Sequence, residues 1–250
     1  MNELKKLWQH EEEIAHIKGW DFSYIEGKYN EDTNFGWNYM DIVRKYIKPD
    51  MRILDIDTGG AEVLLTLNHP YSLTSCTEGY EPNILLCKER LLPLGIDFKE
   101  CKDVSNMPFD SEMFDMIINR HGSFDVKELH RLLKKDGIFI TQQVGDQNNQ
   151  NLVEVLLPHL PKRLLKWNLN YQRNLFLNQG FEILEEDEAF TTMDFYDMGA
   201  FVWYAKIIPW EFTGFNVETC FEKLLELNKK IMQEGYISGT VHRYMIVAKK

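Results

Sequence analysis

Between residues 52 and 145 short apolar segments alternate with amphipathic ones, and this alternation restricts the fold more than any other feature of the chain. Strands are expected at 52–56, 72–79, 97–104, 114–122 and 137–145, with helices at 61–69, 83–95 and 126–137 between them. Short strands that alternate with helices form a parallel sheet with helices on both faces. We therefore predict an α/β fold with a doubly wound, mostly parallel sheet, whose ligand binds outside the carboxyl ends of the strands.

The segments on either side of this core are less regular. We expect helices at 36–47, 149–157, 172–179 and 217–234, and two further strands at 181–195 and 240–250, which bring the sheet to seven strands. The apolar segment 194–210 fits either a core helix or a wall over an acceptor pocket. No repeat or linker is visible, so we expect one domain with an N-terminal helical cap (1–50), a central core (51–145) and C-terminal rim or lid elements with the last strands (146–250).

Charge and composition exclude several classes of protein. The net charge of −11 at pH 7 argues against general binding to nucleic acid or to anionic membranes, because both are polyanions. Charges run through the first residues without a secretory signal, and no apolar stretch reaches the length of a membrane span. We expect a cytoplasmic monomer or homodimer. The cysteines lack CxxC spacing, so buried free thiols are expected rather than disulfides or a metal site: Cys76, Cys87, Cys101 and Cys220.

The segment ILDIDTGGAE (53–62) combines a strand, a glycine turn and the start of a helix, an arrangement that holds nucleotide cofactors. Asp57 and Ala61 stand where such turns usually have glycine. Asp visits the left-handed region with some frequency and Ala is favourable at a helix start, so the turn is expected to form. Asp55, Asp57 and Glu62 would repel a pyrophosphate. They suit a cofactor without phosphate that carries cationic groups, such as S-adenosylmethionine.

An acidic residue follows at the end of the next expected strand. Glu78 lies 19 residues after Gly59, where an acid can accept hydrogen bonds from both hydroxyls of a ribose. An acid at a strand end is more often an ordinary solvated charge, but the turn before it favours the ribose role.

These segments together resemble the class I S-adenosylmethionine-dependent methyltransferases, over residues 36–145 and less closely over the C-terminal strands. The matching segments are ILDIDTGGAE, TEGYEPN, KDVSNMPFDSEMFDMII, NRHGSF and LLKKDGIFITQQVG. The resemblance implies a Rossmann-like fold with S-adenosylmethionine as cofactor, the adenine being contacted by Asp103 and flanked by Val104. The complete set of expected cofactor residues is Asp55, Ile56, Asp57, Thr58, Gly59, Gly60, Glu78, Gly79, Asp103, Val104, Asn119, Arg120 and His121, with Trp20 added from the aromatic N-terminal segment.

Methyl transfer from a sulfonium needs orientation and exclusion of water, with a base only where the acceptor carries a proton. No nucleophile or metal site is therefore expected. His121 is the candidate base because a neutral imidazole titrates in the useful range, although a role at the strand end or in contact with the cofactor fits equally well. Arg120 is expected either to bind an acidic substrate or to form a structural ion pair. The acceptor pocket is expected to draw on Tyr24, Tyr196, Trp203 and Tyr204.

The sequence thus predicts a methyltransferase for a small-molecule acceptor, without a nucleic-acid or membrane partner. One alternative is an RNA methyltransferase, because basic and aromatic residues alternate in a pattern typical of nucleic-acid surfaces. These residues are Lys162, Arg163, Lys166, Trp167, Tyr171 and Arg173. The other alternative is a catalytically silent protein that has kept the fold, because Asp57 and Ala61 alter the turn.

Overall fold

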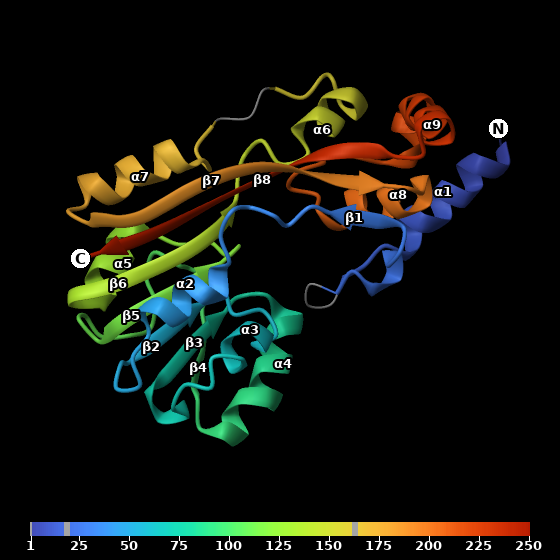
Figure 1. Ribbon diagram of the computed structural model, residues 1–250. Helices are drawn as coiled ribbons and strands as arrows, with labels where there is room; N and C mark the ends of the chain where they lie inside the picture. Colours follow the sequence, from blue (N-terminus) through green and yellow to red (C-terminus); the bar gives the residue numbers. More distant parts are fainter. Residues whose placement is uncertain (1, 18–20, 162–164) are drawn as a thin grey trace. The chain divides into compact units, whose positions relative to one another are not determined.

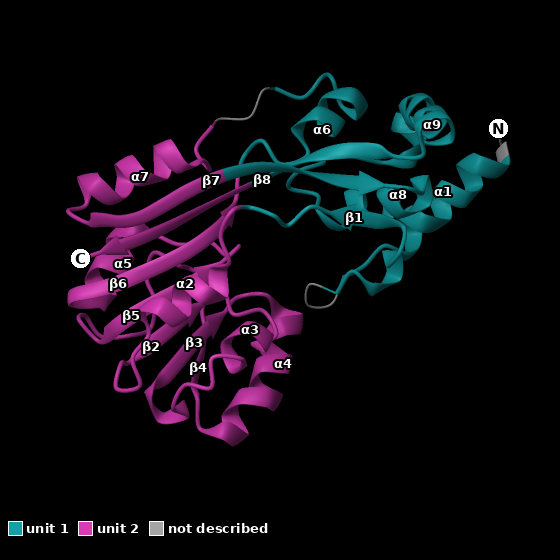
Figure 2. Ribbon diagram, in the orientation of Figure 1, with its two compact units in different colours: residues 1–35, 146–164, 189–242 teal, residues 36–145, 165–188, 243–250 magenta. Residues whose placement is uncertain are grey.

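The computed structural model describes residues 2–17, 21–161 and 165–250 (Figure 1). The chain divides into two compact units, each assembled from three separate segments (Figure 2). Unit 1 comprises residues 1–35, 146–164 and 189–242, and unit 2 comprises residues 36–145, 165–188 and 243–250. Two long strands, β7 (Glu182–Phe195) and β8 (Ile237–Lys249), contribute residues to both units.

Unit 2 is built on a parallel sheet with the strand order β4-β3-β2-β5-β6. The strands are β2 (Ile53–Ile56), β3 (Thr74–Glu78), β4 (Asp97–Glu100), β5 (Phe114–Arg120) and β6 (Leu133–Val144). The last residues of β8 pair antiparallel with β6. The chain adds β3 and β4 on one side of β2 and then β5 and β6 on the other, so the strand order reverses between β2 and β5. This is the predicted doubly wound, mostly parallel arrangement.

Within the described residues the sheet has eight strands, in the order β1-β7-β8-β6-β5-β2-β3-β4, rather than the predicted seven. The additional strand is β1 (Tyr29–Glu31), which pairs antiparallel with the end of β7 in unit 1, with Tyr29 opposite Phe195. The sequence did not indicate it because three residues are too few to display an alternation of apolar and polar side chains. Its pairing depends on β7 being long enough to offer an edge.

The described residues of unit 2 contain five helices, and three of them begin at polar caps. The five helices are α2 (Tyr39–Tyr46), α3 (Glu62–Leu65), α4 (Glu81–Leu91), α5 (Val126–Leu132) and α7 (Leu169–Asn178). Short 3-10 turns lie at Tyr71–Leu73 and Leu92–Leu94. The side chains of Asn38, Asp125 and Asn168 accept the N-terminal amides of α2, α5 and α7.

Two helices end earlier than the sequence predicted. α3 stops at Leu65 instead of continuing to 69, because Asn68 turns into the left-handed region with a φ of 51° just before Pro70. α5 stops at Leu132 instead of continuing to 137, because Leu133 is already extended and pairs with Phe114. At α5 a tertiary contact thus overrides a helical pattern that is locally acceptable, whereas at α3 the local sequence ends the helix.

The hydrophobic core of unit 2 has two layers, one on each face of the sheet. Leu54 and Ile117 pack in one cluster, whereas their neighbours Ile53 and Met116 pack in the other. Successive strand residues point to opposite faces, so a strand that is buried on both sides needs an apolar residue at almost every position. β2 (ILDI) and most of β5 (FDMIINR) follow this rule, whereas β3 (TSCTE) is buried but mostly polar.

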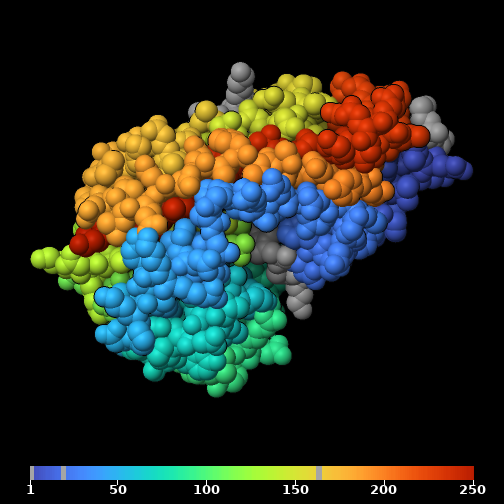
Figure 3. Space-filling model, in the orientation of Figure 1, coloured from blue at the N-terminus to red at the C-terminus, as the bar shows by residue number. Residues whose placement is uncertain are grey.

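Unit 1 surrounds its own core with α1 (Asn2–Ile14), a 3-10 turn (Ser23–Ile25), α6 (Gln150–Leu156), α8 (Met198–Ile207) and α9 (Val217–Glu234). All residues of α8 except Lys206 are buried. Trp8 of α1 and Ile25 join α8 in the same cluster. In Figure 3 the blue N-terminal residues lie beside the orange residues of β7 and α8. The core-helix interpretation of 194–210 is therefore confirmed for 198–207.

Two expectations concern the chain as a whole. All four cysteines are free and buried, as predicted. No helix within the described residues is both long enough and apolar enough to cross a membrane.

Candidate cofactor site

The turn after β2 contains three residues in the left-handed conformation. Asp57, Gly59 and Ala61 have φ angles of 55°, 65° and 64°. The expectation that Asp57 can adopt this conformation is confirmed. The expectation that Ala61 occupies a favourable helix start is wrong, because Ala61 is the left-handed N-cap of α3, a conformation that a Cβ disfavours. The turn keeps its shape with only one glycine at these three positions.

Glu78 joins the ends of β2 and β3. Its side chain is 5% exposed. Oε2 accepts a hydrogen bond from the N–H of Gly59 at 2.8 Å, and Oε1 accepts from the N–H groups of Gly79 and Tyr80, also at 2.8 Å. A Cβ on Gly79 would lie 2.6 Å from the carbonyl oxygen of Cys101, so this position requires glycine. The acid predicted to bind ribose therefore also organises the turn.

Arg90 of α4 holds the other side of the turn. Its guanidinium donates to the carbonyl oxygen of Gly60 at 2.8 Å and forms an ion pair with Glu62. Glu62 was one of three carboxylates expected to repel a pyrophosphate. Arg90 neutralises it, so this repulsion depends on Asp55 and Asp57.

Two other carboxylates at the turn have no cationic partner among the described residues. Asp55 is 6% exposed and accepts from the hydroxyl of Thr58 at 2.6 Å, and Asp57 accepts from the N–H of Ser123 at 3.1 Å. Burial, with the charges of Asp57 and Glu78, raises the pKa of Asp55 to about 7. Burial and the charge of Glu78 raise the pKa of Asp57 to about 6. The turn thus carries negative charge that its surroundings leave uncompensated.

A buried tyrosine hydroxyl belongs to the same region. Tyr39 of α2 is 5% exposed, and its hydroxyl has no hydrogen-bond partner in the part of the chain that the structure describes. Burial and the charge of Asp55 raise the pKa of Tyr39 well above its usual value, so the hydroxyl stays protonated. An unsatisfied buried hydroxyl costs about 1–3 kcal/mol, a cost that a bound polar ligand can remove.

The loop after β5 packs directly on the turn. Asn119 is fully buried, and its Nδ2 donates to the carbonyl oxygen of Ile56 at 2.9 Å. A Cβ on Gly122 would lie 2.5 Å from the Cβ of Asp57, so this position also requires glycine. The aspartate that stands in place of a turn glycine is therefore matched by a glycine in the facing loop.

His121 lies in the same loop with a φ of 63°. Its N–H donates to the carbonyl oxygen of Gln142 at 2.9 Å, and its Nε2 lies 3.2 Å from the side-chain nitrogen of Gln142. Although His121 is exposed to solvent, desolvation by the surrounding protein and the charges of Arg243 and Arg120 lower its pKa well below the usual value. The ring is therefore neutral at neutral pH, and a role for His121 as a base stays a prediction. Arg120 is exposed and has no ion-pair partner within the described residues.

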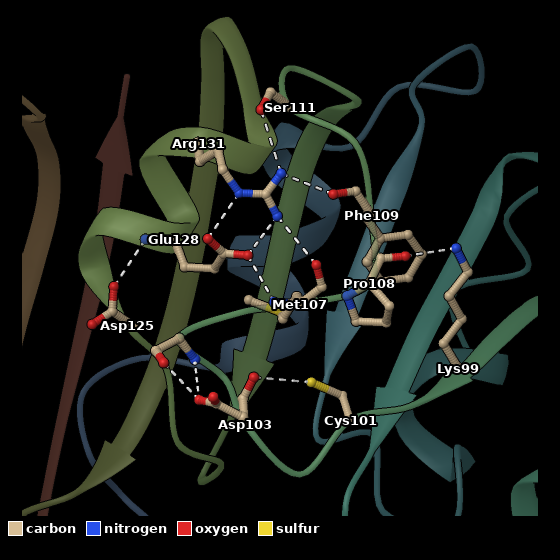
Figure 4. Close-up of polar contacts among 11 residues, drawn as sticks. Lys99, Cys101, Asp103, Met107, Pro108, Phe109, Ser111, Asp125, Glu128 and Arg131 are labelled. Carbon is tan, nitrogen blue, oxygen red and sulfur yellow. Dashed lines mark hydrogen bonds and ion pairs between the residues drawn. The ribbon is translucent and has the colours of Figure 1, made fainter.

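The loop between β4 and β5 is clamped by two residues of α5 (Figure 4). Arg131 donates to the carbonyl oxygens of Met107 and Phe109 at 3.2 and 2.8 Å and pairs with Glu128 at 2.5 Å. Glu128 in turn accepts from the N–H of Met107 at 2.8 Å. Lys99 of β4 closes the other end by donating to the carbonyl oxygen of Pro108 at 2.8 Å.

This clamped loop carries the two residues expected beside the adenine. Asp103 is exposed, and its Oδ1 accepts from the N–H and the hydroxyl of Ser105 at 3.0 and 2.6 Å. These bonds lower the pKa of Asp103, so it is ionised at neutral pH. Val104 is half-buried and packs against the core. Both residues follow the carboxyl end of β4.

Comparison with known proteins shows similarity in sequence to one group of proteins and similarity in fold to several solved structures. No family model matches the chain. The phthiotriol/phenolphthiotriol dimycocerosates methyltransferase of Mycobacterium tuberculosis strain H37Ra is 32% identical over 114 residues, which cover 43% of this chain and 42% of that protein. The chain thus matches less than half the length of this curated relative.

Among solved structures, a "putative methyltransferase" from Bacillus halodurans C-125 superposes with a TM-score of 0.58 at 17% identity, covering 84% of this chain and 98% of that one. This chain has the class I methyltransferase fold. The [4+2]-cyclase SpnF also superposes, with a TM-score of 0.52 at 15% identity, covering 99% of this chain and 92% of that one. The methyltransferase fold alone therefore does not fix the reaction.

Within this methyltransferase fold, the predicted cofactor residues of unit 2 gather at the carboxyl ends of β2, β3, β4 and β5. The uncompensated carboxylates of Asp55 and Asp57 fit a ligand that carries positive charge, and the unpartnered hydroxyl of Tyr39 fits a polar group beside them. The residues present therefore fit S-adenosylmethionine, which has an ammonium and a sulfonium group.

The residues predicted to line the acceptor pocket lie in unit 1. Trp203 and Tyr204 are 2% and 5% exposed within the core of that unit, and the exposed ring of Tyr24 stacks on Trp203 with centroids 5.4 Å apart. Tyr196 is exposed, and Trp20 lies outside the described residues. Packing accounts for Trp203 and Tyr204 without a ligand, and a role for these residues in binding an acceptor stays a prediction.

The basic segment that suggested RNA binding is partly neutralised. Arg173 forms an ion pair with Glu186 at 3.4 Å, and Trp167 packs edge-on against Phe124. Lys162 and Arg163 lie outside the described residues.

Sequence reasoning missed several residues that shape the site, namely Trp37, Tyr39, Arg90, Glu128, Arg131 and Gln142. Of these residues, only Gln142 could have been found from the sequence, because two consecutive glutamines interrupt a mostly apolar strand in FITQQV. Buried polar side chains in a central strand need partners, so such an interruption indicates a site. The others stand in ordinary helical sequence, and only the fold brings them to the site.

Proposed function

We propose that this protein is an S-adenosylmethionine-dependent methyltransferase that acts on a small-molecule acceptor. One observation carries the proposal: Asp55 and Asp57 flank a glycine turn at the switch point of the sheet, with raised pKa values and no cationic partner among the described residues. A cationic cofactor without phosphate complements this charge. The methyltransferase fold and the mycobacterial relative support the same class of chemistry.

In this proposal each element holds one part of the cofactor. Asp55 and Asp57 bind the positively charged groups, Glu78 accepts from the ribose hydroxyls, and Asp103 accepts from the adenine amine while Val104 packs on the ring. The cofactor supplies a methyl group activated by a positive sulfur. The protein orients the acceptor and excludes water, and it needs a base only if the acceptor loses a proton.

A small acceptor is favoured over RNA by electrostatics. The net charge of −11 opposes a polyanion, and of the four basic residues in the segment 162–173 one is neutralised by Glu186. A silent cofactor-binding protein is a second candidate, because Asp57 and Ala61 both hold left-handed conformations that glycine adopts more easily. Binding without turnover over a broad panel of acceptors would identify that case.

The proposal predicts which ligands stabilise the protein. S-adenosylmethionine and S-adenosylhomocysteine, each at about 100 times its dissociation constant, should stabilise the fold by roughly 2.7 kcal/mol, and NAD should not. Thermal shift and isothermal titration calorimetry measure this directly. The absence of any shift with both adenosyl ligands at millimolar concentration would rule the assignment out.

Two variants test the role of charge. Asp55→Asn should weaken S-adenosylmethionine about tenfold or more and S-adenosylhomocysteine less, because only the former carries a sulfonium. Glu62→Gln removes the same charge from the same turn, but Arg90 already neutralises Glu62 at an exposed position, so the affinity should change little. Equal losses in the two variants would contradict a specific role for Asp55.

A further inference from the structure

Three side chains from separate elements of unit 2 form a hydrogen-bonded chain that ends on His121. Trp37, just before α2, donates from its indole Nε1 to Oε1 of Gln142 at 2.9 Å. The Nε2 of Gln142, on β6, lies 3.2 Å from Nε2 of His121. The backbone of Gln142 also accepts from the N–H of His121 at 2.9 Å. Gln142 thus contacts both the backbone and the ring of His121.

The chemistry of these groups fixes the proton on the histidine. An indole N–H can only donate, so the atom of Gln142 that faces Trp37 must be the oxygen. The amide nitrogen of Gln142 then faces His121, and an amide NH₂ group can only donate. Nε2 of His121 must therefore accept, which leaves the proton of the neutral ring on Nδ1.

The remaining ring nitrogen is available to a ligand. Nδ1 of His121 has no hydrogen-bond partner among the described residues, and the side chain is exposed. The charged groups facing it are Arg120 of β5 and Arg243 of β8, and both cations oppose protonation of the ring. His121 thus offers a hydrogen-bond donor beside positive charge, and its lone pair is occupied by Gln142.

We propose that His121 donates a hydrogen bond from Nδ1 to an anionic oxygen of the ligand, a carboxylate or a phosphate, with Arg120 beside it and with Gln142 and Trp37 as positioning residues. His121 is then not the base of the reaction. The inference about the ring stands by itself, and only the identity of the ligand rests on the proposed function. The anionic oxygen belongs either to the amino-acid part of the cofactor or to an acidic acceptor.

Nuclear magnetic resonance of the ring nitrogens tests the proton's position without any cofactor. Long-range ¹H–¹⁵N correlations distinguish the two neutral tautomers, and His121→Asn assigns the signals because Asn tolerates the left-handed backbone. We expect the Nδ1–H tautomer, with a protonation midpoint below that of an ordinary histidine. The Nε2–H tautomer, or a protonation midpoint at about 6.5 or above, would overturn the proposal.

A single substitution at Gln142 should exchange the donor and the acceptor in its hydrogen bond with His121. In Gln142→Glu the side chain facing Nε2 can only accept when ionised, so the ring should become protonated at Nε2 and its midpoint should rise by about one pH unit or more. Trp37→Phe keeps an aromatic ring but removes the donor that orients Gln142, so both tautomers should appear. Gln179→Glu introduces the same charge at the end of α7 and should leave the spectrum of His121 unchanged. An unchanged tautomer in both Gln142→Glu and Trp37→Phe would exclude the positioning role.

Two kinds of probe then identify the oxygen. If S-adenosylhomocysteine shifts the Nδ1–H signal, its carboxylate is the acceptor of the hydrogen bond. If the signal moves only when sodium acetate or sodium phosphate is added to that complex, the oxygen belongs to an acidic methyl acceptor. If none of these probes moves it although calorimetry shows S-adenosylhomocysteine to be bound, donation to an anion is excluded. If S-adenosylhomocysteine does not bind at all, the proposed function fails while the tautomer result still stands.

Discussion

Glu78 has two tasks, since its carboxylate accepts three backbone amides and is also expected to bind the ribose. Glu78→Ala should lower the free energy of unfolding by about 1–3 kcal/mol even without ligand, because buried amides lose their acceptor. Glu78→Gln keeps one acceptor oxygen and should lower it less. Both variants should bind S-adenosylhomocysteine at least tenfold more weakly. Denaturant titration and calorimetry separate the two effects, and an unchanged unfolding free energy for Glu78→Ala would show that these amides do not depend on it.

Asp57 should make the protein less stable as the pH rises. Its pKa of about 6 in the folded state exceeds the ordinary value of 3.8, so the folded chain holds the proton more tightly than the unfolded chain. Its contribution to stability is fully present below about pH 4 and falls as the pH rises through about 6. Asp57→Asn keeps an oxygen for the N–H of Ser123 and removes the charge. We expect the variant to exceed the wild type by about 1–3 kcal/mol at pH 7.5, with little difference at pH 4.5.

A second aspartate provides the control for this experiment. The pKa of Asp103 is lowered by its bonds to Ser105, so its ionised form stabilises the folded state and is lost as the pH falls below the ordinary value. Asp103→Asn should therefore have the opposite pH dependence in urea unfolding. The same sign for both variants would contradict the local origin of the effect.

At the scale of elements, the clamp from α5 should decide how well the adenine is recognised. Arg131→Met removes the bonds that hold the β4–β5 loop, so Asp103 loses its fixed position. We expect about tenfold weaker binding of S-adenosylhomocysteine and a reduced preference over S-inosylhomocysteine, which lacks the adenine amine. Lys127→Met on the same helix is the matched control. An unchanged preference between the two ligands would show that the clamp only stabilises the fold.

Some helices and strands could be predicted from the sequence alone, and others could not. The strands β2, β5 and β6 were predictable because mostly apolar segments mark strands that are buried on both faces. The strands β3 (TSCTE) and β4 (DFKE) are mostly polar, and only their place after a predicted helix indicated them. The early end of α5 and the short strand β1 were not predictable, because each depends on a partner outside its own segment. The early end of α3 is different, because Pro70 stands in the sequence just after it. The ion pair between Arg90 and Glu62 was not predictable either, because the two residues are 28 positions apart in the sequence.

At the scale of the molecule, periodicity and charge predicted the class of fold and the position of the turn, but not the division into two units. Residues 1–35 and 189–242 belong to one unit although more than 150 residues separate them. Amphipathic patterns report which face of an element is buried and carry no information about which other element covers it. The left-handed Ala61 was missed for a related reason, since propensity at a helix start does not reveal the local φ.

The three-segment construction of each unit determines when the protein can fold during its synthesis. Unit 2 lacks the antiparallel neighbour of β6 until residues 243–249, at the end of β8, have left the ribosome. The helix α1 lacks its packing partners α8 and α9 until they have been translated, about 200 residues later. Closing such long loops is slow, and a nascent chain that has not yet formed these contacts exposes the apolar surface of its core. A nascent chain stalled before β8 should therefore be a client for chaperones, and a chain stalled after β8 has fully emerged should not.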